Sequence, residues 1–202
     1  QTTWCAEKTI EFMDENQDKP WLLSVNIYDP HPPFNPPTEY RDQFAAEQMP
    51  GSHFRDSDLA QQKILESLDF QSKAHNPEDL DIKNPIIAKP IIPGGGTEGN
   101  SGGDRNVKTL QAAYYAMIKL IDDQLARVVK HLDDTGQRER TIIVFTSDHG
   151  ETLGDHGLIQ KGCRFYEGLV RVPLIFNCPG RIQEGLVNDA LVELTDKAPT
   201  FL

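Results

Sequence analysis

An apolar stripe between Val107 and Leu132 constrains the fold more than any other feature of the sequence. Its residues recur at steps of three and four positions, which places them on one side of an α-helix. They are Leu110, Tyr114, Met117, Ile121, Leu125, Val128 and Leu132. Because Tyr114 and Met117 lie on this stripe, we interpret them as core residues rather than as part of a cofactor site.

Apolar segments on either side of this helix predict β-strands. Residues 21–27 and 141–146 are both mainly apolar, and a strand–helix–strand order favours two parallel strands joined by a right-handed crossover. A further strand is predicted at 172–178. At 186–194 the sequence indicates either a fourth strand or an irregular arm. The expected class is α/β, with a mixed, mostly parallel sheet flanked by helices.

Polar residues follow the strand predicted at 141–146. Ligands of open α/β sheets bind just beyond the carboxyl ends of the strands, and a carboxylate beside an imidazole there could form half of a metal site. The alternative is a helix N-cap, with Ser147 or Asp148 capping a first turn. The residues concerned are Ser147, Asp148, His149, Gly150 and Glu151.

A proline-rich loop follows the first predicted strand and carries His31. Five of the eight residues from 30 to 37 are proline, which predicts a rigid, extended loop. Parallel strands would bring this loop to the same sheet edge as Asp148. A lone histidine is more often structural, but a stiff loop would hold His31 in one place, so a binding role remains open.

The remaining segments are less informative. Residues 2–12 predict a short helix, and residues 58–70 could form an amphipathic helix. We interpret residues 51–105 as a flexible insertion, because long loops without regular structure are mobile or form lids. Its glycine-rich end, residues 93–103, lacks the Lys-Ser/Thr of a phosphate-binding P-loop.

Composition excludes several classes of function. The formal net charge of the 202 residues is 20 minus 31, or −11, which argues against nucleic acid as a partner but permits a small anionic substrate. There is no apolar run of 18 residues, so no membrane span is predicted. The three cysteines have no paired spacing, which predicts neither a disulfide framework nor a zinc site. No signal-peptide pattern is present, so the compartment stays open.

Several short motifs resemble the sulfatase family of the alkaline phosphatase superfamily. In order they are Ser-Asp-His-Gly-Glu at 147–151, Gly-Asp-His-Gly at 154–157, Lys161, Tyr-Glu at 166–167 and Arg-Val-Pro-Leu-Ile at 171–175. His-Pro-Pro-Phe-Asn-Pro-Pro at 31–37 and residues 114–124 are similar to further segments of that family. The resemblance implies a three-layer, alkaline-phosphatase-like fold, of which residues 1–202 would be the later part of the catalytic domain.

The resemblance also implies roles for four residues. Asp148 and His149 would bind Ca²⁺ (or Mg²⁺), while His31 and Lys161 would contact the sulfate and the leaving group. Many sulfatases carry Asp-Asn where this chain has Asp148-His149, whereas other sulfatases and the related phosphonate monoester hydrolases carry Asp-His. A phosphonate monoester or phosphodiester hydrolase therefore remains an alternative. The second Asp-His pair, Asp155-His156, is interpreted as structuring its loop.

The family's nucleophile is a formylglycine made within Cys/Ser-x-Pro/Ala-x-Arg, and none of the cysteines here fits that motif: Cys5, Cys163 and Cys178. The family's early Asp-Asp ligand pair is also missing. We therefore expect both in the remainder of the polypeptide, upstream of this chain, and expect the isolated 202 residues to be inactive. The expected substrate is a small sulfated compound. A periplasmic or secreted location would be in keeping with the family, but the compartment is left open. A catalytically inactive, sulfatase-like binding domain is the other alternative.

Overall fold

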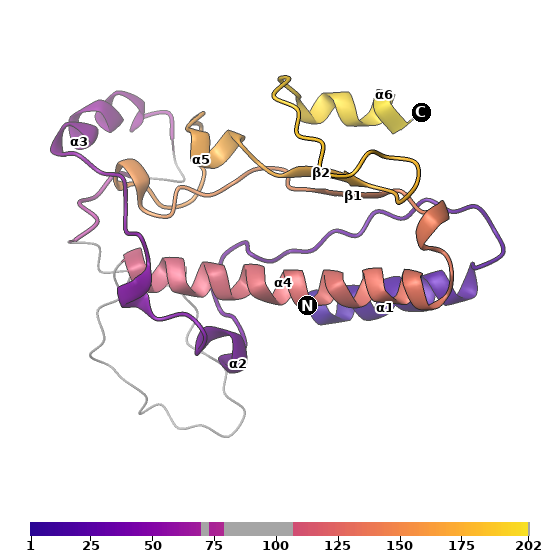
Figure 1. Cartoon of the computed structure of the whole chain (residues 1–202). Helices are drawn as coiled ribbons and strands as arrows, with labels where there is room; N and C mark the ends of the chain where they lie inside the picture. Colours follow the sequence, from indigo (N-terminus) through magenta and orange to yellow (C-terminus); the bar gives the residue numbers. More distant parts are fainter. Residues whose placement is uncertain (70–72, 79–106, 202) are drawn as a thin grey trace.

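Two long helices form one layer of the molecule. The structure, a computed structural model, describes residues 1–69, 73–78 and 107–201. Helix α4 (Val107–Asp134) confirms the helix predicted from the apolar stripe, and helix α1 (Thr2–Glu15) confirms the one predicted at 2–12. In Figure 1, α1 lies along the C-terminal half of α4. Three residues of the stripe are fully buried and the other four are half-buried, as expected for an amphipathic helix.

A short β-ribbon lies on one side of this helix layer. Strands β1 (Ile143–Thr146) and β2 (Leu174–Asn177) confirm two of the predicted strands in shorter form. They pair antiparallel, with Ile143 opposite Asn177 and Thr146 opposite Leu174. In the view of Figure 1 the ribbon lies between α4 and helix α6 (Lys197–Phe201), and the Phe176 and Phe201 rings are 6.1 Å apart.

The strand predicted at 21–27 is not formed. The segment is extended and, in Figure 1, runs in the same direction as β1, but no strand ladder joins it to another segment of the described chain. Apolar composition favours an extended backbone, whereas a strand also requires a hydrogen-bonding neighbour. Leu22 is 90% exposed, so this part of the segment also lacks a packing partner. The described sheet is a two-stranded antiparallel pair, and the predicted mostly parallel, three-layer arrangement is not confirmed.

Shorter elements complete the described chain. Helix α3 (Asp56–Gln62) and the 3₁₀ helix η2 (Lys63–Leu65) fall largely within the helix predicted at 58–70. The glycine-rich residues 93–103 lie outside the described residues. Of the two alternatives predicted for residues 186–194, a fourth strand or an irregular arm, residues 186–193 form the irregular arm. The other short elements are α2 (Thr38–Arg41), η1 (Ala46–Gln48), η3 (Arg138–Arg140), η4 (Asp155–Gly157), α5 (Glu167–Val170) and η5 (Leu194–Asp196).

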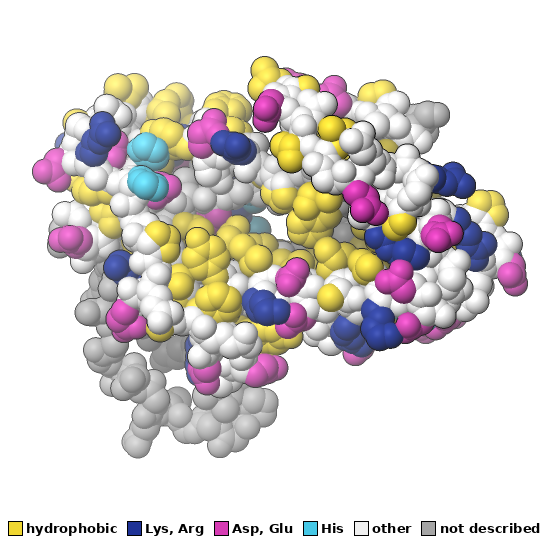
Figure 2. Space-filling view, viewed as in Figure 1, with side chains coloured by type: hydrophobic (Ala, Val, Ile, Leu, Met, Phe, Trp, Pro, Cys, Tyr) yellow, Lys and Arg dark blue, Asp and Glu magenta, His cyan; other side chains and the backbone are white. Residues whose placement is uncertain are grey.

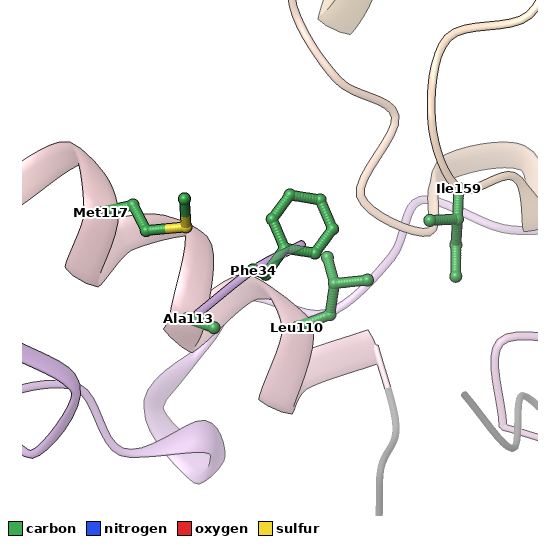
Figure 3. Packing of buried hydrophobic residues seen from close by; sticks show 5 residues of the cluster. All are labelled: Phe34, Leu110, Ala113, Met117 and Ile159. Carbon is green, nitrogen blue, oxygen red and sulfur yellow. The ribbon is translucent and has the colours of Figure 1, made fainter. Parts of the chain in front are cut away.

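The buried apolar core joins two loops to the N-terminal half of α4. Figure 3 shows Phe34, from the proline-rich loop, and Ile159, from the loop after β1, approaching the helix. The members of this cluster are Phe34, Leu110, Ala113, Met117 and Ile159. On the face drawn in Figure 2, acidic and basic side chains are interspersed rather than segregated. No helix within the described ranges has the length and apolar character needed to cross a membrane.

Candidate active site

Asp148 and His149 lie exposed just beyond the end of β1. Their side chains are 82% and 42% exposed, and Asp148 Oδ1 accepts the backbone N–H of His149 at 3.0 Å. The α-helix that this region could have capped is not formed, since β1 continues into an irregular loop. Partial burial raises the pKa of Asp148, but the adjacent His149 ring and the backbone N–H outweigh this and leave the pKa below its usual value.

The two side chains are placed so that they could share one cation. Asp148 Oδ2 and His149 Nε2 are 3.6 Å apart, and His149 Nδ1 lies 2.9 Å from the carbonyl oxygen of Gly150. A proton on Nδ1 would satisfy that carbonyl and leave the Nε2 lone pair free for a metal. Two ligands of a Mg²⁺ or Ca²⁺ ion, each about 2.1–2.5 Å from it, would be roughly 3.0–3.5 Å apart in a six-coordinate shell. The observed 3.6 Å lies just above this range, and the pair would supply two of the ligands that such an ion needs.

Among the described residues, no third His, Cys, Asp or Glu side chain joins this pair. Within 1–69, 73–78 and 107–201, no cluster of three or more His, Cys, Asp or Glu side chains could hold a metal. Ca²⁺ takes six to eight oxygen ligands and Mg²⁺ takes six ligands. The pair alone would therefore bind either ion weakly.

The loop behind this pair is fixed by backbone contacts. Gly150 N–H donates to Leu169 O at 2.8 Å, and Glu151 N–H donates to Gly168 O at 3.0 Å. A Cβ at position 150 would overlap the Gly168 carbonyl, so the close approach requires glycine there. The exposed pair thus projects from a backbone that is held on its far side by the segment around α5.

Glu151 turns inward where Asp148 and His149 face solvent. It is 7% exposed, and burial raises the pKa of its carboxyl group. The charge of Lys161 and the backbone N–H groups of Thr152, Gln160 and Leu153 act in the opposite direction. Burial also raises the pKa of Tyr114 on α4 to about 12, with the Glu151 charge as a second cause. Glu151 thus sits among Lys161, Tyr114 and the loop backbone.

Lys161 follows a tightly held stretch of chain. The Thr152 hydroxyl lies 2.9 Å from Leu158 O and 2.7 Å from Gln160 O, and Ile159 is part of the apolar core. The Lys161 side chain itself is half-buried. The residues just before Lys161 are therefore fixed both by hydrogen bonds and by packing.

His31 projects into solvent from a loop that is anchored a few residues further on. Its Nδ1 lies 2.8 Å from Pro32 O, and its ring is 4.6 Å from that of Tyr28. Phe34 is 1% exposed and its ring packs edge-on against Tyr114, with centroids 5.8 Å apart. The loop is therefore anchored on α4 by Phe34, which leaves His31 free to contact a ligand.

The apolar core brings the supports of His31 and Lys161 together. Phe34 follows His31 by three residues, Ile159 precedes Lys161 by two, and both belong to one cluster on α4 (Figure 3). Within the described part of the chain, no hydrogen bond or ion pair joins His31 to Lys161 or to Asp148. The segments that anchor His31 and Lys161 thus meet in one cluster, while the Asp148-His149 pair lies at the end of β1.

Asp155 and His156 structure their loop, as interpreted from the sequence. His53 N–H donates to Asp155 Oδ1 at 2.7 Å, and His156 Nδ1 lies 3.4 Å from Asp58 Oδ1. The His156 ring also stacks on Tyr166, with centroids 3.9 Å apart. These contacts hold the loop after β1 against the segment that contains α3.

Some supporting residues were not predicted from the sequence. Gln111 is buried on α4, donates to Gly51 O at 2.8 Å and to Leu153 O at 3.1 Å, and accepts from Gly51 N–H at 3.1 Å. The sequence signal for the burial of Gln111 was its position next to Leu110 of the apolar stripe. For Glu151 there was no such signal, because nothing in its local sequence shows that it is buried.

Comparison with solved structures defines the class of fold. The structure superimposes on a phosphonate monoester hydrolase of Agrobacterium radiobacter with a TM-score of 0.67 and 30% sequence identity, covering 89% of this chain and 33% of that one. A putative sulfatase of Bacteroides fragilis gives a TM-score of 0.56 at 26% identity. The fold is therefore part of an alkaline-phosphatase-like hydrolase domain.

The sequence comparisons identify the family. The family model named Sulfatase matches residues 2–202, and the chain belongs to the sulfatase family. An arylsulfatase of Clostridium perfringens is 30% identical over 205 residues, which cover all of this chain and 37% of that protein. The multifunctional alkaline phosphatase superfamily protein PehA of Trinickia caryophylli is 31% identical over 210 residues, again with 37% of its length covered. The chain thus spans slightly more than a third of these relatives.

Proposed function

We propose that the full-length protein hydrolyses sulfate esters and that this chain supplies the substrate-contacting residues and part of the metal site. The observation that carries the proposal is the shared cluster on α4, because it holds the loops of His31 and Lys161 on one part of the molecule. Membership of the sulfatase family and similarity to an arylsulfatase support the same chemistry.

Each of the four predicted site residues has a role in this proposal. The Lys161 ammonium group neutralises negative charge that develops on the ester oxygens and the leaving group. His31 binds the sulfate from its stiff loop. Asp148 and His149 hold the divalent ion, with its other ligands supplied from outside this chain. When present, that Ca²⁺ or Mg²⁺ ion and a formylglycine from outside this chain would supply the Lewis acid and the nucleophile.

A second candidate is hydrolysis of phosphonate monoesters or phosphodiesters. Two observations favour it: the Asp148-His149 pair, and the likeness to a phosphonate monoester hydrolase at a TM-score of 0.67. Such substrates are also small anions with a tetrahedral centre, so the roles of Lys161 and His31 would carry over. The two reactions therefore have to be distinguished by substrate.

The test is a substrate comparison with the full-length protein. p-Nitrophenyl sulfate, p-nitrophenyl phenylphosphonate and bis-p-nitrophenyl phosphate release the same chromophore, and the sulfate should give the highest kcat/KM. Higher kcat/KM for either phosphorus ester would move the assignment to the second candidate. Turnover of none of them, with an intact nucleophile motif in the full sequence, would instead favour a binding domain.

Two lysine variants, one at the site and one elsewhere on the surface, test the role of Lys161. Lys161→Ala should lower kcat/KM for the sulfate ester at least about tenfold, on the order of 1.4 kcal/mol in the barrier. Lys130→Ala, which removes an exposed lysine from α4, should leave kcat/KM within about twofold of wild type. Equal rates for Lys161→Ala and wild type would reject the assigned role.

A further inference from the structure

A buried polar network lies next to Lys161. Arg164 and Asp69 form an ion pair, with only 3% and 1% of their side chains exposed. Arg164 Nε donates to Gln62 Oε1 at 2.6 Å, and Gln62 Nε2 donates to the Tyr166 hydroxyl at 2.6 Å. The network joins the loop after β1 to α3 and to the turn that follows η2.

The backbone beside Lys161 rests directly on this network. Gly162 has a φ of +62°, and a Cβ there would overlap the Asp69 carboxylate and lie 2.8 Å from Arg164 Nη1. Only glycine permits both the conformation and the close approach. Together with Thr152 and Ile159 on the other side, this contact fixes the chain immediately before and immediately after Lys161.

Fold stability alone does not account for a buried ion pair at this place. Burying two charges costs free energy that their attraction only partly repays, and apolar replacements are often as stable or more so. The same two segments are also held together by Asp58 with His156 and by His53 with Asp155, neither of which involves Gly162. What the Arg164 network adds is a directional, hydrogen-bonded support next to Lys161.

We propose that Arg164, held by Asp69 and Gln62, is a positioning residue that fixes Lys161 for its contact with the substrate. The proposal rests on the function proposed above for Lys161. The planar guanidinium group forms an ion pair with Asp69 and donates a hydrogen bond to Gln62, a combination that the point charge of a lysine does not reproduce. A displacement of about 1 Å in a catalytic group can cost on the order of 100-fold in rate, so loss of the network should act mainly on kcat.

A double-mutant cycle in the full-length protein tests the proposal. Arg164→Lys should lower kcat/KM for the sulfate ester about tenfold when Lys161 is present, and less than about twofold in the Lys161→Ala background. A role confined to the fold would lower kcat/KM equally in both backgrounds, and that result would overturn the proposal.

Variants of Gln62 provide a second route if Arg164→Lys does not fold. Gln62→Met removes the acceptor for Arg164 Nε and should show the same dependence on Lys161. Gln62→Glu keeps the acceptor for Arg164 Nε and replaces the Nε2 donor by an oxygen to which the Tyr166 hydroxyl can donate, so it should retain kcat within about threefold of wild type. Two results would contradict the positioning role. One is an equal loss of kcat/KM for Gln62→Met with Lys161 present and in the Lys161→Ala background, and the other is an equal kcat for the Gln62→Met and Gln62→Glu variants.

Asp58→Asn is the matched control for loss of stability at the same junction. It weakens the contact with His156 and leaves Arg164 untouched, so it should lower the Tm while leaving kcat near that of wild type. A kcat loss as large as that of Arg164→Lys would overturn the proposal. If Lys161→Ala has the same kcat/KM as wild type, the role assigned to Lys161 is wrong. If Lys161→Ala has a lower kcat/KM but Arg164→Lys lowers kcat/KM by the same factor in both backgrounds, only the positioning role of Arg164 is wrong.

Discussion

Lys161 and the Asp148-His149 pair lie on the same loop after β1, yet the two parts of this loop are held very differently. Lys161 is half-buried between the apolar core on one side and the Arg164 network on the other. The Asp148 side chain is 82% exposed, and it accepts hydrogen bonds from the neighbouring Ser147 and His149. The chain therefore positions Lys161 itself, whereas it presents the side chains of Asp148 and His149 at the surface.

This difference shows which interactions each region depends on. A cation at the ester group must be placed accurately before substrate arrives, and packing can do this within one chain. A metal site is completed by the ion and by further ligands, so two exposed donors can be ordered when the ion binds. The following predictions test this contrast, and they are ordered by the expected change in the free energy of unfolding.

The largest change is expected at Phe34, which anchors the His31 loop to α4. Phe34→Ala should lower the free energy of unfolding by about 3–5 kcal/mol, because the side chain is 1% exposed and its removal leaves a cavity. Urea unfolding measures this directly. Leu22→Ala, at a site 90% exposed, is the matched control and should change stability by less than about 0.5 kcal/mol. Similar losses for the two variants would contradict the described core.

A smaller change is expected at Gln111, which joins α4 to Gly51 and Leu153. Gln111→Leu should lower the free energy of unfolding by about 1–3 kcal/mol, because buried backbone groups lose their partner. The exposed Gln61 on α3 offers a control, since Gln61→Leu should have little effect. A neutral Gln111→Leu variant would show that these backbone groups find other partners.

Substitution of Tyr114 should change the pH dependence of the free energy of unfolding only at alkaline pH. Burial, with a contribution from the Glu151 charge, raises its pKa from 10.0 to about 12. The unfolded state therefore releases the proton first, so this contribution to stability is complete below pH 10 and declines as the pH rises toward 12. Urea unfolding from pH 9 to 11.5 should show a shallower decline for Tyr114→Phe than for wild type. Identical pH dependence would contradict the burial of this hydroxyl.

The sequence predicted the features that depend on local pattern. The stripe from Leu110 to Leu132 has a helical period and became α4, and the apolar runs around Val144 and Ile175 became strands. The pairing of the strands could not be predicted, because it depends on hydrogen-bonding partners that apolar composition does not specify. For that reason residues 21–27 were expected to be a parallel strand and are instead an extended segment that pairs with no other strand in the described part of the chain.

The support of the candidate site was harder to predict than its candidate residues. Lys161 and the Asp148-His149 pair stand in short motifs that can be recognised in the sequence. Gln62 and Arg164, in contrast, are 102 positions apart, and Asp69 lies in a segment interpreted as a flexible insertion. Nothing local in the sequence shows that these polar side chains are buried together, because burial of a polar group depends on partners brought in by the fold.

The central claim is that Asp148 serves the reaction rather than the fold, and one variant tests it directly. In the full-length protein, Asp148→Asn should leave the free energy of unfolding, measured with chelator present, within about 0.5 kcal/mol of wild type. The same variant should hydrolyse p-nitrophenyl sulfate at least about 100-fold more slowly, since a weakened metal site removes several kcal/mol of transition-state stabilisation. Wild-type turnover by Asp148→Asn, or a loss of activity that follows a loss of folding, would contradict the account.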